Sequence, residues 1–247
     1  MAMAPRENEV IGTTEVTKVT KVTKVTEITE ITAWGDFTCP WSHLAWRRTE
    51  ALADDGVAVD WRTVQHERWR HLTPADHAER LQTVHREVQQ VLGHLLPGET
   101  LPHTTNGHAP FTGAATSAYA EAYASGVARP VRRTLFEAFW EQSVDLDDAR
   151  TLRALLAEDL RKGTSTCEPV WRWGHACDVT GGPISSAAWH LVRDWRSQWR
   201  ELGGTVPTVR AGGETFVGVE AVDWLGARLR DRGLGAWDDR AREHPAA

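Results

Sequence analysis

The chain has 247 residues and a formal net charge of −6. A chain of this length forms one large domain or a small domain with an insertion, and it can bury a core. The acidic balance provides no clustered basic face of the kind that nucleic-acid binding requires. No apolar run approaches the length that spans a membrane. We therefore expect a protein that binds neither nucleic acid nor membrane.

The first nine residues, MAMAPRENE, are polar and unlike a secretory signal. We therefore expect a cytoplasmic protein. A reducing compartment disfavours structural disulfides, so the three cysteines are predicted to be free, catalytic or redox-cycling.

Residues 13–32 form a repeat with period three, TTEVTKVTKVTKVTEITEIT. A half-buried strand needs period two, so the valines of this repeat would not stay on one face. We predict an extended, solvated N-terminal extension over residues 1–26. A core strand is expected from about residue 28 to residue 34.

The next segments predict a strand–helix–strand unit. Pro40 and the apolar spacing after it indicate a helix over residues 39–53, which Asp54-Asp55-Gly56 ends. Residues 57–64 alternate in polarity like a second strand. Such a unit forms a right-handed parallel pair of strands.

The pattern is helical from residue 67 to residue 183. Thr73-Pro74-Ala75-Asp76 predicts a helix start. Further helices are expected over residues 114–125, 131–142 and 147–162, with a loop over 164–182. The chain then returns to a helix over 186–202, strands over 206–210 and 215–217, and a last helix that ends at Gly233.

Cys39 stands at the first position of the helix that follows the core strand, and Pro40 comes next. A helix N-terminus stabilises negative charge through its unpaired N–H groups and its dipole. A thiol there is expected to ionise more readily than the reference pKa of about 8.5, and the thiolate is the reactive form. We therefore predict that Cys39 is a nucleophile.

Three segments resemble one family in the same order. Asp36-Phe-Thr-Cys-Pro-Trp41 resembles the opening of DsbA-like proteins of the FrnE type, whose relatives include 2-hydroxychromene-2-carboxylate isomerases and kappa-class glutathione transferases. Residues 134–148 are similar to the family's Leu-Phe-x-Ala-Tyr/Phe helix and the acidic turn after it, and residues 204–218 to its cis-proline loop and hairpin. The resemblance implies an α/β thioredoxin fold with an inserted all-helical domain. Its parts would be residues 27–66, 67–183 and 184–233, with a tail over 234–247.

The resemblance also implies roles for individual residues. Pro207 would be a cis-proline, with the backbone of Val206 offered to an extended substrate beside Pro40 and Trp41. Ser42 occupies the position where the family's oxidoreductases usually carry a second cysteine. A serine cannot resolve a mixed disulfide, so release would need an external thiol such as glutathione or mycothiol, or another cysteine of the chain. Ser42 could instead donate a hydrogen bond to Cys39.

Several residues keep more than one interpretation. His43 lies one helical turn after Cys39 and could pair with its thiolate, or lie on the surface. Cys167 and Cys177 could form a redox pair, resolve Cys39, or be two unrelated thiols. Their spacing does not suit zinc, and His66-Glu67 with His71 has the wrong spacing for a metalloprotease helix. We therefore expect no metal site.

The leading hypothesis is a thiol–disulfide oxidoreductase that uses the single motif cysteine Cys39 with a low-molecular-weight thiol and no tightly bound cofactor. Its partner would be a small thiol or thiol conjugate, or a protein or peptide disulfide, held in a wide cleft between core and insertion. The sequence leaves open whether the protein forms a homodimer. The first alternative is a thiol-cofactor-dependent isomerase or transferase acting on a small electrophile. The second is a binding protein that has lost catalysis.

Overall fold

The computed structural model describes residues 28–66, 74–102 and 111–234. The predicted N-terminal extension, His71 and nearly all of the predicted tail lie outside these residues. The elements in order are β1 (Glu30–Gly35), α1 (Pro40–Asp54), β2 (Ala58–Thr63), α2 (Pro74–Leu92), α3 (Gly113–Ala124), α4 (Ala128–Trp140), α5 (Ala149–Arg161), α6 (Glu168–Trp173), α7 (Ser186–Glu201), β3 (Thr208–Ala211), β4 (Glu214–Val217) and α8 (Val219–Asp231).

The four strands form one mixed sheet in the order β2-β1-β3-β4. β1 and β2 are parallel and are joined through α1, as the strand–helix–strand pattern predicts. β3 pairs antiparallel with both β1 and β4. Gly212 and Gly213 connect β3 to β4 with φ of 58° and 86°, so a two-residue turn that needs positive φ closes this hairpin.

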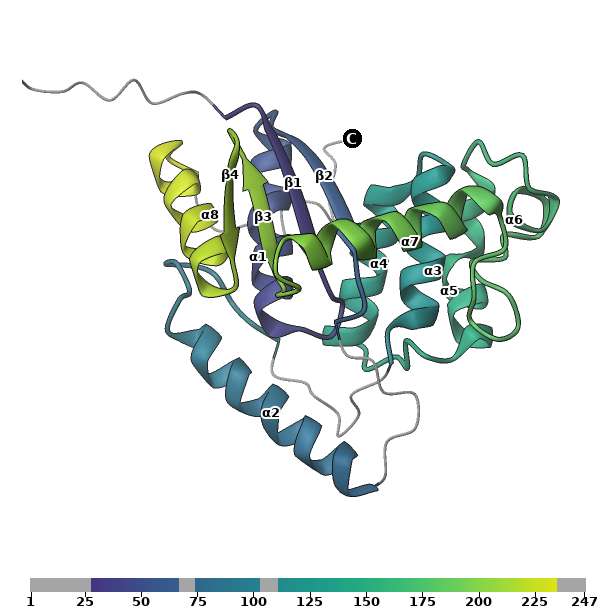
Figure 1. The fold of residues 1–247 in the computed structure, drawn as a ribbon, viewed down its shortest axis with the longest axis horizontal. Helices are drawn as coiled ribbons and strands as arrows, with labels where there is room; N and C mark the ends of the chain where they lie inside the picture. The colour runs from purple at the N-terminus through teal and green to yellow at the C-terminus, as the bar shows by residue number, and fades with distance from the viewer. Residues whose placement is uncertain (1–27, 67–73, 103–110, 235–247) are drawn as a thin grey trace, which may run out of the picture.

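Helices cover the sheet on both faces. α1 and α8 pack against each other on one side, and α7 crosses the opposite face of the sheet, where it contacts β2 and α3 (Figure 1). α3, α4, α5 and α6 form a helical layer beside the sheet, whereas α2 packs against α1. This arrangement is an α/β thioredoxin fold with helices inserted between β2 and β3.

One predicted segment is wrong in detail. Residues 164–182 were expected to be a loop, but residues 168–173 form the short helix α6. Pro169 lies in its first turn, and Gly174 ends it with a left-handed φ of 68°. A helix of this length is too short to show an apolar repeat, so periodicity does not reveal it.

The aromatic end of α4 supports the loop between β1 and α1. The Phe136 ring stacks on Trp46 with centroids 4.6 Å apart and meets Phe37 edge-on at 4.9 Å. Trp140 donates its indole N–H to the Phe37 carbonyl at 2.9 Å. The segment similar to the family's Leu-Phe-x-Ala helix therefore fixes the backbone just before Cys39.

Candidate active site

Cys39 lies where β1 ends and α1 begins. It is the N-cap of α1, with extended backbone at φ −84° and ψ 122°, and Pro40 is the first helical residue. The Cys39 N–H donates to the Asp36 carbonyl at 3.2 Å, and the Cys39 carbonyl accepts from the His43 N–H at 2.9 Å. These bonds form the tight connection and helix start that the sequence predicts around Cys39.

The environment of the Cys39 sulfur differs from the expectation of an easily ionised thiol. Its side chain is only 4% exposed. Burial raises the pKa of Cys39 to about 12, and the negative charges of Glu87 and Asp36 contribute to this rise. Burial of the thiol and the two negative charges therefore oppose the stabilisation of a thiolate that the helix N-terminus provides.

Ser42 provides the polar contacts of the sulfur. Hydrogen bonds from its hydroxyl and its backbone N–H act on Cys39 and lower the pKa of the thiol, against the effect of burial. The Ser42 oxygen in turn accepts the Asp36 N–H at 3.2 Å. Ser42 therefore links the Cys39 sulfur to the loop that precedes it. A hydrogen bond from Ser42 to Cys39 is one of the two roles considered for this serine from the sequence.

A buried carboxylate, Asp36, organises the same loop, and the sequence did not single it out. One Asp36 oxygen accepts from the N–H and hydroxyl of Thr38, both at 3.1 Å. The other accepts from the His66 N–H at 3.0 Å and from the Thr112 hydroxyl at 3.1 Å, and it lies 2.8 Å from His66 Nδ1. Burial alone would raise the pKa of Asp36, but His66 and these hydrogen bonds hold it below its usual value. Asp36 is therefore ionised at neutral pH.

His43 does not pair with Cys39 and does not lie on the surface. Its buried ring is surrounded by Trp46, Phe136 and Trp140, with centroid separations of 5.4, 5.9 and 5.1 Å. Neither ring nitrogen has a hydrogen-bond partner among the described residues. Burial, with a smaller effect of Arg47, lowers the pKa of His43 well below its usual value, so the ring is neutral and acts as packing.

The residues predicted to contact substrate lie around the same strand end. Pro40 and Trp41 are buried, and the Trp41 ring meets His94 edge-on at 5.2 Å. The Val206–Pro207 peptide bond is cis, the isomer that the resemblance implies. Trp34 pairs with Thr208 in the β1–β3 ladder, so Pro207 stands at the end of β1 that leads to Cys39.

The other two cysteines belong to the helical layer. Cys167 is partly buried as the N-cap of α6, and Cys177 is fully buried. The Cys177 carbonyl accepts from Arg153 Nε at 2.7 Å, and burial raises the pKa of its thiol to about 11. All three cysteines are free, so the structure forms no Cys167–Cys177 disulfide.

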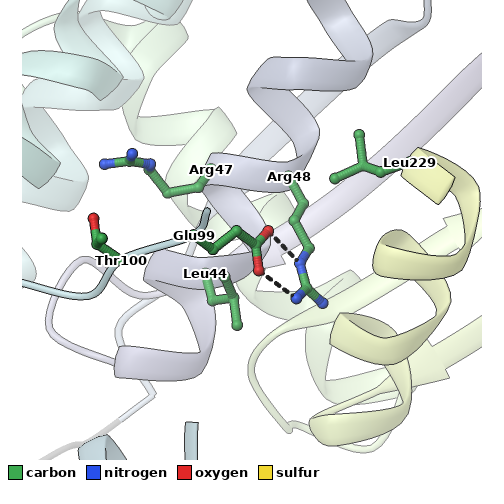
Figure 2. A pocket seen from close by; sticks show the side chains of 6 residues that line it. All are labelled: Leu44, Arg47, Arg48, Glu99, Thr100 and Leu229. Carbon is green, nitrogen blue, oxygen red and sulfur yellow. Dashed lines mark hydrogen bonds and ion pairs between the residues drawn. The ribbon is translucent and has the colours of Figure 1, made fainter. Parts of the chain in front are cut away.

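The described part of the chain has a pocket whose lining does not include Cys39. It is a small pocket, lined by Leu44, Arg47, Arg48, Glu99, Thr100 and Leu229. Figure 2 shows Arg48 extended toward the Glu99 carboxylate, which it binds with two nitrogens at 2.9 and 2.6 Å. Arg48 also donates to the carbonyls of Val222 and His94. This pocket therefore surrounds a structural ion pair between α1 and the segment after α2, and the same arginine is hydrogen-bonded to α8.

Cys39, Pro40 and Trp41 are all buried, so the described structure leaves little of this motif open to solvent. Within the same residues, no group of three or more His, Cys, Asp or Glu side chains is arranged to hold a metal ion. None of the helices described is long and apolar enough to cross a membrane.

A cysteine at this helix start, a cis-proline at the same end of β1 and a four-stranded mixed sheet together define a protein of the thioredoxin-fold class. The profile of the DSBA-like thioredoxin domain matches residues 30–160, which is more than half of the chain. The chain belongs to the DSBA-like thioredoxin family. No curated protein sequence matches it.

Solved structures share the fold at low sequence identity. A 2-hydroxychromene-2-carboxylate isomerase matches with a TM-score of 0.57 and 20% identity, over 83% of this chain and 96% of the isomerase. A probable DsbA oxidoreductase from Streptomyces coelicolor matches with a TM-score of 0.54 and 17% identity, over 86% and 95%. The cytosolic disulfide reductase DsbM from Pseudomonas aeruginosa, solved with GSH, matches with a TM-score of 0.54 and 16% identity, over 81% and 99%. At these sequence identities, the three matches show a shared fold.

Proposed function

We propose that this protein is a thiol–disulfide oxidoreductase in which Cys39 exchanges with an external low-molecular-weight thiol. The observation that carries the proposal is the position of Cys39 as N-cap of α1, with both the hydroxyl and the N–H of Ser42 acting on its sulfur. Hydrogen bonds to a thiolate favour the charged form. The fold of the DsbM structure with GSH supports a small thiol of the glutathione kind as partner.

The exchange is a balanced two-step reaction. The Cys39 thiolate attacks a small disulfide, its new S–S bond replaces the one that breaks, and the released thiolate takes up the proton that Cys39 lost. A small thiol, as its thiolate, then attacks the sulfur that is bonded to Cys39; a new small disulfide forms as the bond to Cys39 breaks, and Cys39 takes up the proton that the attacking thiol lost. Because Ser42 cannot supply that second thiol, a monothiol cycle is the natural chemistry of this motif.

A direct test follows the mixed disulfide by intact mass. The Cys167→Ala/Cys177→Ala variant is mixed with hydroxyethyl disulfide, an uncharged probe, and then with a reducing thiol. We expect one adduct, located at Cys39 by peptide mapping, which the thiol removes. The added Cys39→Ser change serves as the control and should abolish the adduct. Absence of any adduct in the parent variant, with the fold intact by circular dichroism, would contradict the proposal.

One observation favours a second candidate, a thiol-cofactor-dependent isomerase or transferase. With a pKa of about 12, Cys39 stays protonated at neutral pH and can donate a hydrogen bond to the thiolate of a bound cofactor. In that role a serine hydroxyl would serve as well as the thiol. Activity on a small electrophile that survives Cys39→Ser and requires added thiol would establish this candidate, whereas the oxidoreductase loses its activity in the same variant.

A further inference from the structure

Trp41, the motif residue predicted to contact substrate, is covered by a side chain from outside the motif. Trp41 is 8% exposed, and Cys39, two residues before it, is 4% exposed. The His94 ring meets the Trp41 ring edge-on, with centroids 5.2 Å apart. His94 lies two residues after the end of α2, so the covering residue comes from the helical insertion. A small molecule that packs on this edge of Trp41 must first displace the His94 ring.

The backbone of His94 is anchored more firmly than its side chain. Its carbonyl accepts from the Arg48 guanidinium at 2.6 Å, and Arg48 also binds the Glu99 carboxylate at 2.9 and 2.6 Å (Figure 2). The same guanidinium donates to the Val222 carbonyl. The side chains of Arg48 and Glu99 are 1% and 6% exposed, and buried charge-assisted contacts of this kind are costly to break. The segment after α2 therefore stays in place even when the His94 ring turns.

An exposed contact with α8 holds the His94 ring on Trp41. Ring atom Nδ1 lies 2.8 Å from a carboxylate oxygen of Asp223. The His94 and Asp223 side chains are 32% and 56% exposed, so water competes for this contact and its energy is small. Rotation of a partly exposed side chain is also fast. Loss of the contact therefore leaves the ring able to rotate into solvent, away from Trp41.

We propose that His94 is a gate residue that controls access of small disulfides and thiols to Trp41 and Cys39, and that Asp223 is the positioning residue that holds the gate closed. The role of the gate in exchange rests on the proposed function, whereas its closure over Trp41 does not. Only the molecules whose His94 ring has turned away accept substrate, so the apparent affinity is reduced by the fraction of molecules in this state. A change that frees the ring raises access to the motif.

The test measures access to Cys39 in the full chain. Each cysteine is labelled with iodoacetamide and followed by peptide mass, and adduct formation with hydroxyethyl disulfide is followed in parallel. Asp223→Asn should raise both rates at Cys39 by about two- to fivefold, the range expected for loss of an exposed ion pair. His94→Ala should raise them at least as much. Cys177 is fully buried in the helical layer and should keep its parent labelling rate, which separates opening of the gate from loosening of the whole fold.

Glu220→Gln is the matched control, because Glu220 is exposed on α8 three residues before Asp223. It removes the same charge and should leave the rates at Cys39 unchanged. The two gate variants also separate access from electrostatics, because Asp223→Asn removes a negative charge whereas His94→Ala leaves that charge in place. Both should nevertheless speed the reaction. In a Trp41→Ala background neither change should add to the rate, because the ring that the gate covers is gone.

Unchanged labelling of Cys39 in both gate variants would overturn the inference. An equal rise at Cys177 would also overturn it, since His94 and Asp223 would then be structural residues, and a rise that Glu220→Gln reproduces would assign the effect to charge. The disulfide probe separates the two proposals. Faster alkylation with no adduct in parent or variants supports the gate and refutes exchange at Cys39, whereas an adduct that forms at the parent rate in every variant supports exchange and refutes the gate.

Discussion

Cys39 and Cys167 are both N-caps, and the comparison separates the effect of a helix terminus from that of its surroundings. Their backbones are nearly the same, at φ −84° and ψ 122° for Cys39 and φ −78° and ψ 115° for Cys167, and each has a proline in the first turn. α1 has 15 residues and buries Cys39 beside Ser42, Asp36 and Glu87. α6 has six residues and leaves Cys167 partly exposed. Local backbone geometry alone therefore does not define an active site.

The largest expected difference between the two cysteines is in disulfide exchange. Cys39→Ser should abolish the thiol-reversible adduct and, with it, the turnover of a small disulfide. Cys167→Ser should leave that turnover unchanged. The reason is that Ser42 acts as a hydrogen-bond donor to the Cys39 sulfur, and the cis Val206–Pro207 bond stands at the end of β1 that leads to Cys39. Steady-state reduction of hydroxyethyl disulfide measures both variants. Equal losses in the two would show that Cys167 takes part as a resolving thiol.

The side chains that pack near the start of α1 should contribute more to the free energy of unfolding than an exposed side chain of α6. Phe136→Ala removes a ring that stacks on Trp46 and meets Phe37, and should cost about 3–5 kcal/mol in the free energy of unfolding. Trp171 of α6 is 48% exposed, so Trp171→Ala should change it by no more than about 0.5 kcal/mol. Urea denaturation followed by circular dichroism measures both. Comparable losses would mean that α6 is held as firmly as the start of α1.

Sequence patterns predicted the fold well because its long elements repeat their apolar residues over several turns. α7, for example, was expected over residues 186–202 and spans Ser186–Glu201. The position of Cys39 was predicted from Pro40 and from the family resemblance, whereas the cis-proline was predicted from the resemblance alone. α6 escaped prediction because six residues show no period.

The surroundings of the sulfur could not be predicted in the same way. Asp36 and His66 are 30 positions apart, and the charge of Glu87 acts on Cys39 from another helix, so these interactions arise only from tertiary packing. His43 had the right spacing to face Cys39. Nearly all of α1 is buried, however, and a helix without a polar face does not show which side turns toward a site.

The two cysteines should respond differently to alkylation as the pH changes. Because burial raises the pKa of Cys39 to about 12, its thiolate fraction grows by about tenfold for each pH unit below that value, with no plateau between pH 7 and 10. Cys167 is more exposed and should be modified first. Iodoacetamide labelling of single-cysteine variants at several pH values, read by mass, gives both rates. A plateau for Cys39 near pH 7 would show an activated thiol and contradict the effect of burial.

The smallest expected effect concerns the serine beside each cysteine. Ser42 acts as a hydrogen-bond donor to the Cys39 sulfur, whereas the Ser165 oxygen accepts the Cys167 N–H at 3.2 Å. Ser42→Ala should therefore raise the pKa of Cys39 further and slow its alkylation at pH 9 by about three- to tenfold, in keeping with the loss of a hydrogen bond to a charged group. Ser165→Ala, with Cys167 as the only cysteine, should leave the rate at Cys167 nearly unchanged, because its serine contacts the backbone and not the sulfur. If Ser42→Ala instead speeds the reaction, access to the buried sulfur rather than its ionisation limits the rate, and the closed arrangement around Cys39 becomes the main control on its chemistry.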